Sequence, residues 1–480
     1  MKKKFLSNLI LLVLLNLLIK PFWFFGIEVA VQNRVGEEMY GFYFSLFNFA
    51  FILNILLDLG ITNFNNRSIA RDHDLLNSYF SRIVPLKFLL SILYAVVVFI
   101  SGLLVGYSSI QFKLLIVLVI NQFLSSFILY MRSNISGIQL FRTDSLLSVL
   151  DRTLMITMNG ILLWSGLFKK AYQIEWFVYS QTLSYLITLL IVSSIAIHYA
   201  GRIRFNFSLL EFKKIVRLSY PFAILILLMS FFNRADSVMI ERLLPDGKEQ
   251  AGIYAQSFRV LDALSQFAVL FAGLLLPMFS KMIKTGENPG GLISLSSSLL
   301  LGIALSVAVL GIYYNEEIIG LMYNQDRLNS SSIFSMLMLG FVFISVSYIY
   351  GTLLTANGNL KQLNILAGLT VVLNIGLNLI LIPRFKASGA AMASICSQGF
   401  YAISQIITAH RFLNLDLKSS FYLRLIAYGI SISLAGWILH SFVKQVPAIL
   451  LFILLCGILS VILKVIRPLE ILKIFKEEIE

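Results

Sequence analysis

Fourteen long apolar segments, separated by short polar loops, dominate this chain of 480 residues. A membrane-spanning helix needs about 20 predominantly apolar residues, and every segment reaches about that length. Charged residues supply only 13% of the chain, whereas a soluble domain carries about 25%. The sequence therefore predicts an all-α integral membrane protein, with no loop long enough to form a soluble domain. The predicted spans lie near residues 6–30, 42–64, 86–107, 110–131, 146–167, 176–199, 219–243, 252–277, 292–313, 331–355, 362–383, 387–409, 420–441 and 447–466.

The positions of the basic residues predict how these spans are oriented. Lys2, Lys3 and Lys4 precede the first span, and the loops on that side hold more than twice as many lysines and arginines as the opposite loops. Cytoplasmic loops are enriched in basic residues, so fourteen spans place both termini in the cytoplasm. Topology thus accounts for most of the net charge of +14, and no nucleic-acid partner is expected. The leucine-rich N-terminal run lacks a small-residue cleavage site, which favours an uncleaved span over a signal peptide.

Two segments six spans apart resemble each other. Residues 36–47 read GEEMYGFYFSLF and residues 247–258 read GKEQAGIYAQSF, and both lie on the predicted outer side. Chance similarity between two helix ends is the alternative to a true repeat. The identical positions, aligned without a gap, are Gly36/Gly247, Glu38/Glu249, Gly41/Gly252, Tyr43/Tyr254 and Phe47/Phe258.

An even number of intervening spans gives the two copies the same orientation, as in transporters built from parallel repeats. We therefore expect two parallel six-helix lobes around a central cavity, with two additional C-terminal helices. The expected boundaries are 1–200 for the N-terminal lobe, 201–415 for the C-terminal lobe, and 416–480 for the additional helices and a cytoplasmic tail.

Several ionisable and amide side chains fall inside these apolar spans. A charge at the bilayer centre costs about 2.5–3.5 kcal/mol on insertion scales, so it usually faces a cavity or a partner. Lys20 is beside Pro21, which can kink the first span. The alternative is that these groups join helices by hydrogen bonds worth about 0.6 kcal/mol each. The residues expected to line a polar path and bind substrate are Lys20, Arg234, Arg259, Asn16, Asn233, Gln256, Asn374 and Asn378. The candidate ion-pair or coupling residues are Asp236, Asp262, Asp58, Asp151 and Arg152.

No catalytic constellation is visible in the sequence. The four histidines lie at span ends or in loops without ligand spacing, and no glycine-rich phosphate loop occurs. The two cysteines are isolated in apolar runs. We therefore expect no enzyme activity, no metal and no cofactor. The residues concerned are His73, His198, His410, His440, Cys396 and Cys456.

Three stretches carry a resemblance to a known family. Residues 36–71, GEEMYGFYFSLFNFAFILNILLDLGITNFNNRSIAR, resemble the early signature of bacterial polysaccharide exporters. Residues 233–244, NRADSVMIERLL, followed by AGIYAQSFRV, look like that family's seventh and eighth helices. Residues 355–394, TANGNLKQLNILAGLTVVLNIGLNLILIPRFKASGAAMAS, resemble its later hallmark. The chain is thus similar to the Wzx-like O-antigen and capsule flippases of the multidrug/oligosaccharidyl-lipid/polysaccharide exporter superfamily.

The resemblance implies a flippase of the bacterial inner (plasma) membrane that works by alternating access. Its substrate would be an undecaprenyl-pyrophosphate-linked oligosaccharide, and Lys20, Arg234 and Arg259 would meet the pyrophosphate by charge-assisted hydrogen bonds. Amide side chains would bind sugar hydroxyls. The implied partners are this substrate, membrane lipids, and the polysaccharide polymerase and glycosyltransferases of the same pathway.

Other functions remain open at this point. A cation-coupled multidrug exporter of the same superfamily predicts an anionic cavity in which Asp236 or Asp58 binds a proton or sodium. A flippase for lipid II, the peptidoglycan precursor, is a further alternative. A membrane glycosyltransferase or O-antigen ligase usually needs a large periplasmic loop bearing Arg or His, whereas the longest outer loop, residues 315–329, contains only Arg327.

Overall fold

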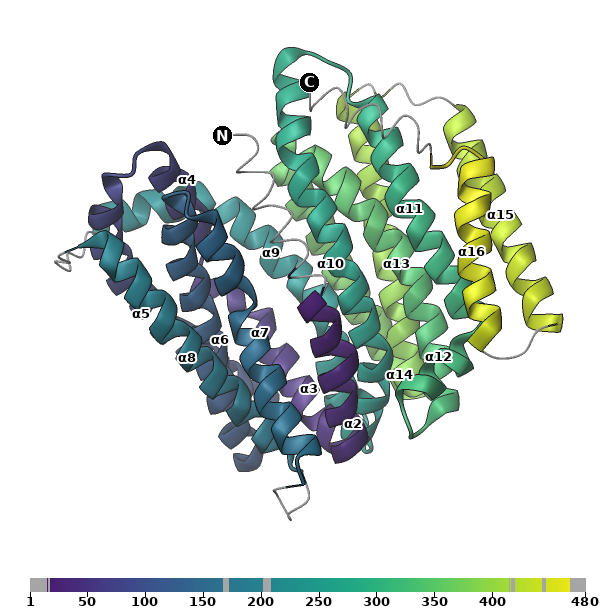
Figure 1. Ribbon diagram of the computed structural model, residues 1–480, viewed down its shortest axis with the longest axis horizontal. Helices are drawn as coiled ribbons and strands as arrows, with labels where there is room; N and C mark the ends of the chain where they lie inside the picture. The colour runs from purple at the N-terminus through teal and green to yellow at the C-terminus, as the bar shows by residue number, and fades with distance from the viewer. Residues whose placement is uncertain are drawn as a thin grey trace. The chain divides into compact units, whose positions relative to one another are not determined.

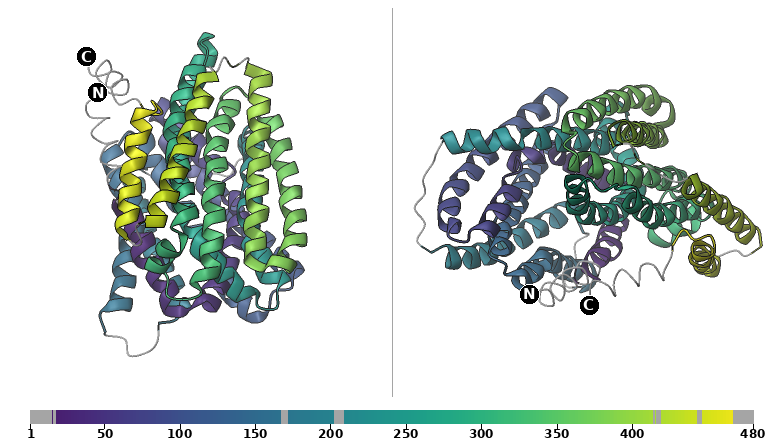
Figure 2. Two further views of the ribbon diagram at one scale, coloured as in Figure 1. Left: turned by 90° about the vertical axis from the view of Figure 1, so that its right-hand side faces the viewer. Right: turned by 90° about the horizontal axis from the view of Figure 1, so that it is seen from above.

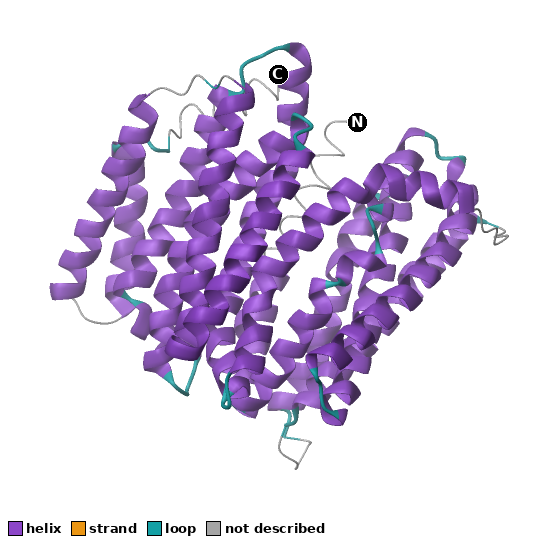
Figure 3. Cartoon of the chain, turned by 180° about the vertical axis from the view of Figure 1, so that it is seen from behind, coloured by secondary structure: helices purple, strands orange, loops and turns teal. Residues whose placement is uncertain are grey.

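The computed structural model describes residues 15, 18–166, 172–201, 209–413, 415, 419–442 and 446–466. In these residues every regular element is a helix and there is no strand (Figures 1 and 3). The predicted all-α membrane class is confirmed. The chain forms two compact units, Met1–Gly252 and Ile253–Glu480. The lobe boundaries expected from the repeat, 1–200 and 201–415, stay a prediction.

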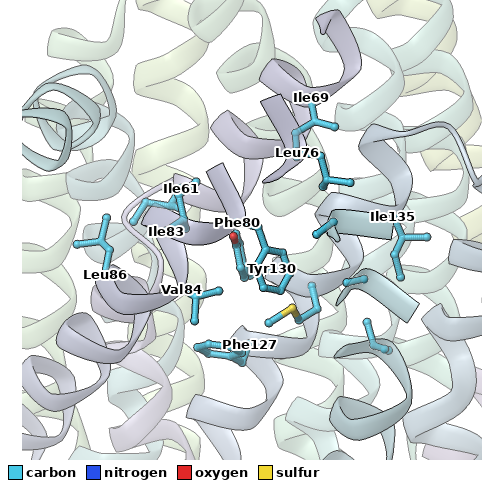
Figure 4. Packing of buried hydrophobic residues seen from close by; sticks show 14 of the residues in the cluster. Ile61, Ile69, Leu76, Phe80, Ile83, Val84, Leu86, Phe127, Tyr130 and Ile135 are labelled. Atoms are coloured by element: carbon cyan, nitrogen blue, oxygen red, sulfur yellow. The ribbon is translucent and has the colours of Figure 1, made fainter. Parts of the chain in front are cut away.

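The first unit is organised around α6. This helix packs against α8, α4 and α3, and it is more deeply buried than the other long helices (Figure 1). Buried side chains of α4, α5 and α6 form its apolar core, in which Phe80 and Tyr130 lie 6.4 Å apart between ring centroids (Figure 4). The elements of the first unit are η1 (Phe22–Glu28), α2 (Val29–Val35), α3 (Glu37–Ile52), η2 (Asn54–Leu57), α4 (Ile61–Arg71), α5 (Leu75–Val105), α6 (Ser109–Gly137), α7 (Phe141–Trp164), α8 (Ile174–Ala200), α9 (Leu209–Leu243) and the first residues of α10 (Gly247–Thr285).

The first two spans of this unit are irregular. Pro21 immediately precedes η1, a π-helical turn, where the proline's missing N–H and ring disturb the normal hydrogen-bond ladder. The second span is broken between α3 and α4, which differ in direction by 52°. Leu59 and Gly60 have positive φ values of 46° and 84°, which interrupt the helix. Both irregularities lie beside charged side chains, because Lys20 precedes Pro21 and Asp58 directly follows η2.

In the second unit α13 packs against α11 and α14, and α15 and α16 lie side by side along α11 (Figure 2). Lys386, with φ 54° and ψ −135°, divides α14 into two helices shortly after Pro383. These halves correspond to the predicted spans 362–383 and 387–409. The remaining elements of this unit are α10 from Ile253 onward, α11 (Gly290–Tyr313), α12 (Asn315–Met322), α13 (Arg327–Ala356), α14 (Leu360–Leu413), α15 (Ser419–Phe442) and α16 (Val446–Ile462).

The observed helices follow the predicted spans. Ten described helices are long and apolar enough to cross a membrane, and the bent pair α3–α4 makes an eleventh span. The apolar part of α16, Pro447–Ile462, is shorter, and the start of the first span lies outside the described residues. Large apolar side chains remain exposed on these helices, among them Leu104 at 84% and Val372 at 72%. Such exposure suits a surface that contacts lipid rather than water.

Candidate functional site

A charged cluster connects the first span with α7. Lys20 lies in the helical residues just ahead of η1, is exposed, and interacts electrostatically with Asp151 and Arg152. Glu28, buried at the end of η1, interacts with Arg152 as well. We call these four residues the first-span cluster. Two positive and two negative side chains give it a formal charge of zero, which lowers the cost of holding ions inside a span.

Aromatic rings support Arg152 in this cluster. The guanidinium carbon lies 5.4 Å from the centroid of the Trp23 ring, and Trp23 stacks on Phe177 at 5.7 Å. Tyr43 meets Phe177 edge to face at 5.4 Å and accepts a hydrogen bond from the Gln181 amide at 3.3 Å. A guanidinium over Trp gains about 0.5–2 kcal/mol, depending on desolvation. The rings therefore fix the position of the Arg152 guanidinium.

Arg234 of α9 is held against α3. Its Nη1 donates to Asn48 Oδ1 at 3.2 Å, and its guanidinium carbon lies 4.7 Å from the Phe51 ring centroid. The Asn48 amide donates in turn to Ser237 Oγ at 2.8 Å. Arg234 and Ser237 are one helical turn apart, so both face α3. Arg234, which was predicted to line a polar path, therefore contacts the second span, and its partner Asn48 was not among the residues predicted from the sequence.

The two glycines matched in the repeat touch each other's segments. A Cβ added to Gly41 would lie 1.9 Å from the Lys248 carbonyl oxygen and 2.4 Å from the Gly252 nitrogen. A Cβ added to Gly252 would lie 2.1 Å from the Glu37 carbonyl oxygen. Gln32 adds a side-chain hydrogen bond of 2.9 Å to the Gly252 carbonyl. Positions 37 and 248 also correspond in the repeat, so each copy presses its glycine against the equivalent carbonyl of the other. Only glycine permits this backbone approach.

The C-terminal end of α9 is tied to the loop before α6. The buried Glu241 carboxylate accepts from the Gln111 amide at 2.9 Å and pairs with Arg242 at 2.6 Å. Arg242 also donates to the Gly106 carbonyl at 3.2 Å and lies 4.7 Å from the Tyr107 ring centroid. Together with the contact between Arg234 and Asn48, these contacts anchor the C-terminal part of α9 within the first unit.

Asp58 forms an ion pair with Lys87, which was not among the residues predicted from the sequence. Lys87 Nζ lies 3.0 Å from Asp58 Oδ1, and Lys87 is 1% exposed while Asp58 is 24% exposed. A second pair, Arg132 with Asp144 at 2.8 Å, joins α6 to α7. Lys87 lies close to the predicted start of the third span, where lysines are common. Its burial could therefore not be predicted from the sequence.

The other predicted residues lie in α9 and in the second unit. Asp236 of α9 is fully buried, and Asn233 beside Arg234 is half-buried. In the second unit Arg259 is buried on α10, and the Asn378 amide donates to Asn374 Oδ1 at 3.2 Å within α14. Gln256 is buried and Asp262 half-buried on α10, and Asn16 lies outside the described residues.

The structure therefore brings together Lys20, Asp151 and Arg152 in one cluster, and it places Arg234 beside Asn48 in another. The substrate-binding and coupling roles of all these residues stay predictions. The described residues contain no group of three or more His, Cys, Asp or Glu side chains placed to hold a metal ion.

Comparison with protein families gives one match. Residues 5–283 fit the family model described as polysaccharide biosynthesis protein. Comparison with curated proteins found no match.

Solved structures share the fold at low sequence identity. A structure titled lipid II flippase MurJ, inward closed conformation, has a TM-score of 0.70 and 14% identity, covering 95% of this chain and 98% of that chain. An inward-facing multidrug resistance MATE family transporter of the MOP superfamily has a TM-score of 0.58 and 16% identity, covering 83% and 94%. A MOP superfamily transporter from Pyrococcus furiosus has a TM-score of 0.52 and 16% identity, covering 85% and 93%. At these identities the likeness establishes the all-helical fold that this chain shares with those proteins.

Proposed function

Because the chain belongs to the polysaccharide biosynthesis protein family, we propose that it is a flippase for undecaprenyl-pyrophosphate-linked oligosaccharide repeat units. It carries them by alternating access from the cytoplasmic to the periplasmic leaflet of the bacterial inner membrane, for O-antigen lipopolysaccharide or capsule. Both termini face the cytoplasm. Glycosyltransferases supply the lipid-linked substrate, and a polymerase consumes it after transfer.

The observation that carries this proposal is the exposed side chain of Lys20, which interacts electrostatically with Arg152. The Arg152 guanidinium is itself held in place by the Trp23 ring. An exposed ammonium inside an apolar span avoids the cost of lipid contact only where water or an anion meets it. Lys20 is influenced by the positive charge of Arg152 as well as by the negative charge of Asp151, so Asp151 offsets its charge only in part while no substrate is bound. A pyrophosphate brings its own negative charge and forms stronger, charge-assisted hydrogen bonds with such cations. The cluster is thus suited to accept a phosphate beside its two cations.

Arg234 offers a second cationic position on another helix of the same unit. Its contacts with Asn48 and Phe51 fix the guanidinium, which is half-buried. A planar guanidinium binds phosphate oxygens in pairs, which suits a diphosphate better than an uncharged sugar. Asn233, next to Arg234 and half-buried, provides an amide for sugar hydroxyls.

The cation-coupled multidrug exporter is the second candidate, and the fold likeness to the MATE family transporter favours it. That function needs an acidic side chain for a proton or sodium. Asp58, one of the two acids considered for this role, already has Lys87 as its partner. We therefore place the lipid-linked glycan first.

The test is a deletion strain complemented with Lys20→Ala or Arg152→Gln. Loss of the protein is expected to leave undecaprenyl-linked glycan on the inner leaflet and to remove the surface glycan. Both variants are expected to reproduce much of that defect at normal protein levels. Lys113→Ala, which removes an exposed lysine of α6, is the matched control and is expected to complement fully. Normal surface glycan in the deletion strain contradicts the proposal, and drug sensitivity with normal glycan supports the exporter.

A further inference from the structure

The break in the second span leaves backbone oxygen atoms that need partners. α3 ends at Ile52, η2 follows, and the chain turns through Leu59 and Gly60 before α4. A carbonyl without a partner is costly inside a membrane, so breaks occur where another group satisfies the freed backbone. Here that group is the Lys87 ammonium, which donates to the Leu57 carbonyl at 2.9 Å.

Three oxygen atoms and an aromatic ring surround Lys87 Nζ. Besides the Leu57 carbonyl, the ammonium donates to Asp58 Oδ1 at 3.0 Å and to Ser126 Oγ at 2.8 Å, which satisfies all three of its N–H groups. The Tyr130 ring centroid lies 5.9 Å away, in the range of a cation–π contact. Main chain, carboxylate, hydroxyl and aromatic ring come from the second span and α6, whereas the cation comes from α5.

We propose that this break is a binding site for a monovalent, ammonium-type cation, and that the chain occupies it permanently with its own Lys87 instead of a diffusible ion. The three oxygens stand at 2.8–3.0 Å, the normal length of N–H···O hydrogen bonds. Magnesium and calcium bind their oxygen ligands at the shorter distances of about 2.0–2.6 Å. The single carboxylate, Asp58, balances one positive charge.

A tethered cation has a consequence for this transporter fold. A diffusible ion can leave when the helices around it move, and its release can drive that movement. Lys87 cannot leave, so the bend between α3 and α4 keeps its charge balance without a cation from solution. The Asp58 carboxylate is then occupied and does not serve as a coupling site. This inference concerns the helix break alone and does not depend on the identity of the substrate.

The test uses the purified full-length protein in detergent. Lys87→Ala removes the ammonium and leaves room for a small cation, so the unfolding midpoint is expected to fall by roughly 5 °C or more. Methylammonium or ammonium chloride is expected to restore at least half of that loss in a saturable manner. Choline, which is too large, is expected to restore none. Lys113→Ala is the matched control and is expected to respond to no salt.

Two further variants keep the test decisive. Adding Asp58→Asn to Lys87→Ala is expected to abolish the response to methylammonium. If Lys87→Ala does not accumulate, Lys87→Met alone is expected to fail and Lys87→Met with Asp58→Asn to recover, because the second change removes the uncompensated carboxylate. The proposal is overturned by a Lys87→Ala protein as stable as the wild type, by a destabilised Lys87→Ala protein that neither methylammonium nor ammonium restores, or by equal rescue with choline. A neutral pair as defective as Lys87→Met also overturns it.

Discussion

Replacing Gly41 by alanine tests the contact between the two repeat copies. The new methyl carbon would lie 1.9 Å from the Lys248 carbonyl oxygen, whereas ordinary contact begins at 3.4 Å, so the two segments must separate by about 1.5 Å. The alanine Cβ has no rotamer to change and the Lys248 oxygen belongs to the backbone, so no side-chain rearrangement relieves the clash. Overpacking costs about 1–3 kcal/mol, and we expect the upper end, about 3 kcal/mol. Gly252→Ala meets the Glu37 carbonyl oxygen at 2.1 Å and is expected to cost about as much.

Gly160→Ala is the matched control, because its methyl would meet only the Trp164 ring at 3.6 Å in the same unit. Alanine is the better helix former by about 0.5–1 kcal/mol, so this variant is expected to be neutral or slightly stabilised. Thermal unfolding in detergent measures the three variants side by side. An unfolding midpoint for Gly41→Ala equal to that of Gly160→Ala would refute the close approach.

Three further outcomes follow from contacts in the first unit. Asn48→Ala removes the acceptor of the Arg234 guanidinium and the donor to Ser237 Oγ, so it is expected to lower stability by about 1–3 kcal/mol in thermal unfolding; an unchanged unfolding midpoint would contradict the proposed importance of this contact. Arg152→Lys keeps the charge but loses the planar guanidinium over Trp23, so glycan export is expected to fall several-fold at unchanged expression, and full activity would contradict the positioning role. Asn159→Ala leaves the Tyr172 hydroxyl without its acceptor and is expected to lower stability by about 1–3 kcal/mol, as measured by thermal unfolding; a loss below about 0.5 kcal/mol would mean that this hydrogen bond is not important.

Hydropathy predicted most of the architecture because a span must be both long and apolar, and both properties are local. It did not reveal the break in the second span, since the span predicted at residues 42–64 continued across Leu59 and Gly60. The kink at Lys386 fell between two predicted spans, where Pro383 gave a local signal. A break in a helix could therefore be predicted from the sequence only where a proline lies next to it.

Polar partners were harder to predict than polar residues. The sequence identified Asp58 and Arg234 as charges within spans, but Lys87 and Asn48 come from other helices at separations that no periodicity encodes. Sequence comparison within the chain did align Gly41 with Gly252. It could not show that these glycines meet, because a repeat fixes equivalence and not contact.

Reconstituted vesicles provide the most direct measurement of lipid-linked glycan transfer. An undecaprenyl-diphosphate oligosaccharide is placed in one leaflet, and its arrival in the other is followed with a membrane-impermeant glycan-modifying enzyme. The wild-type protein is expected to transfer the labelled lipid, Lys20→Ala to do so at least several-fold more slowly, and Lys113→Ala to match the wild type. Protein-independent transfer rates with the wild type would contradict the proposed function, and an unaffected Lys20→Ala would remove the cationic cluster from the mechanism.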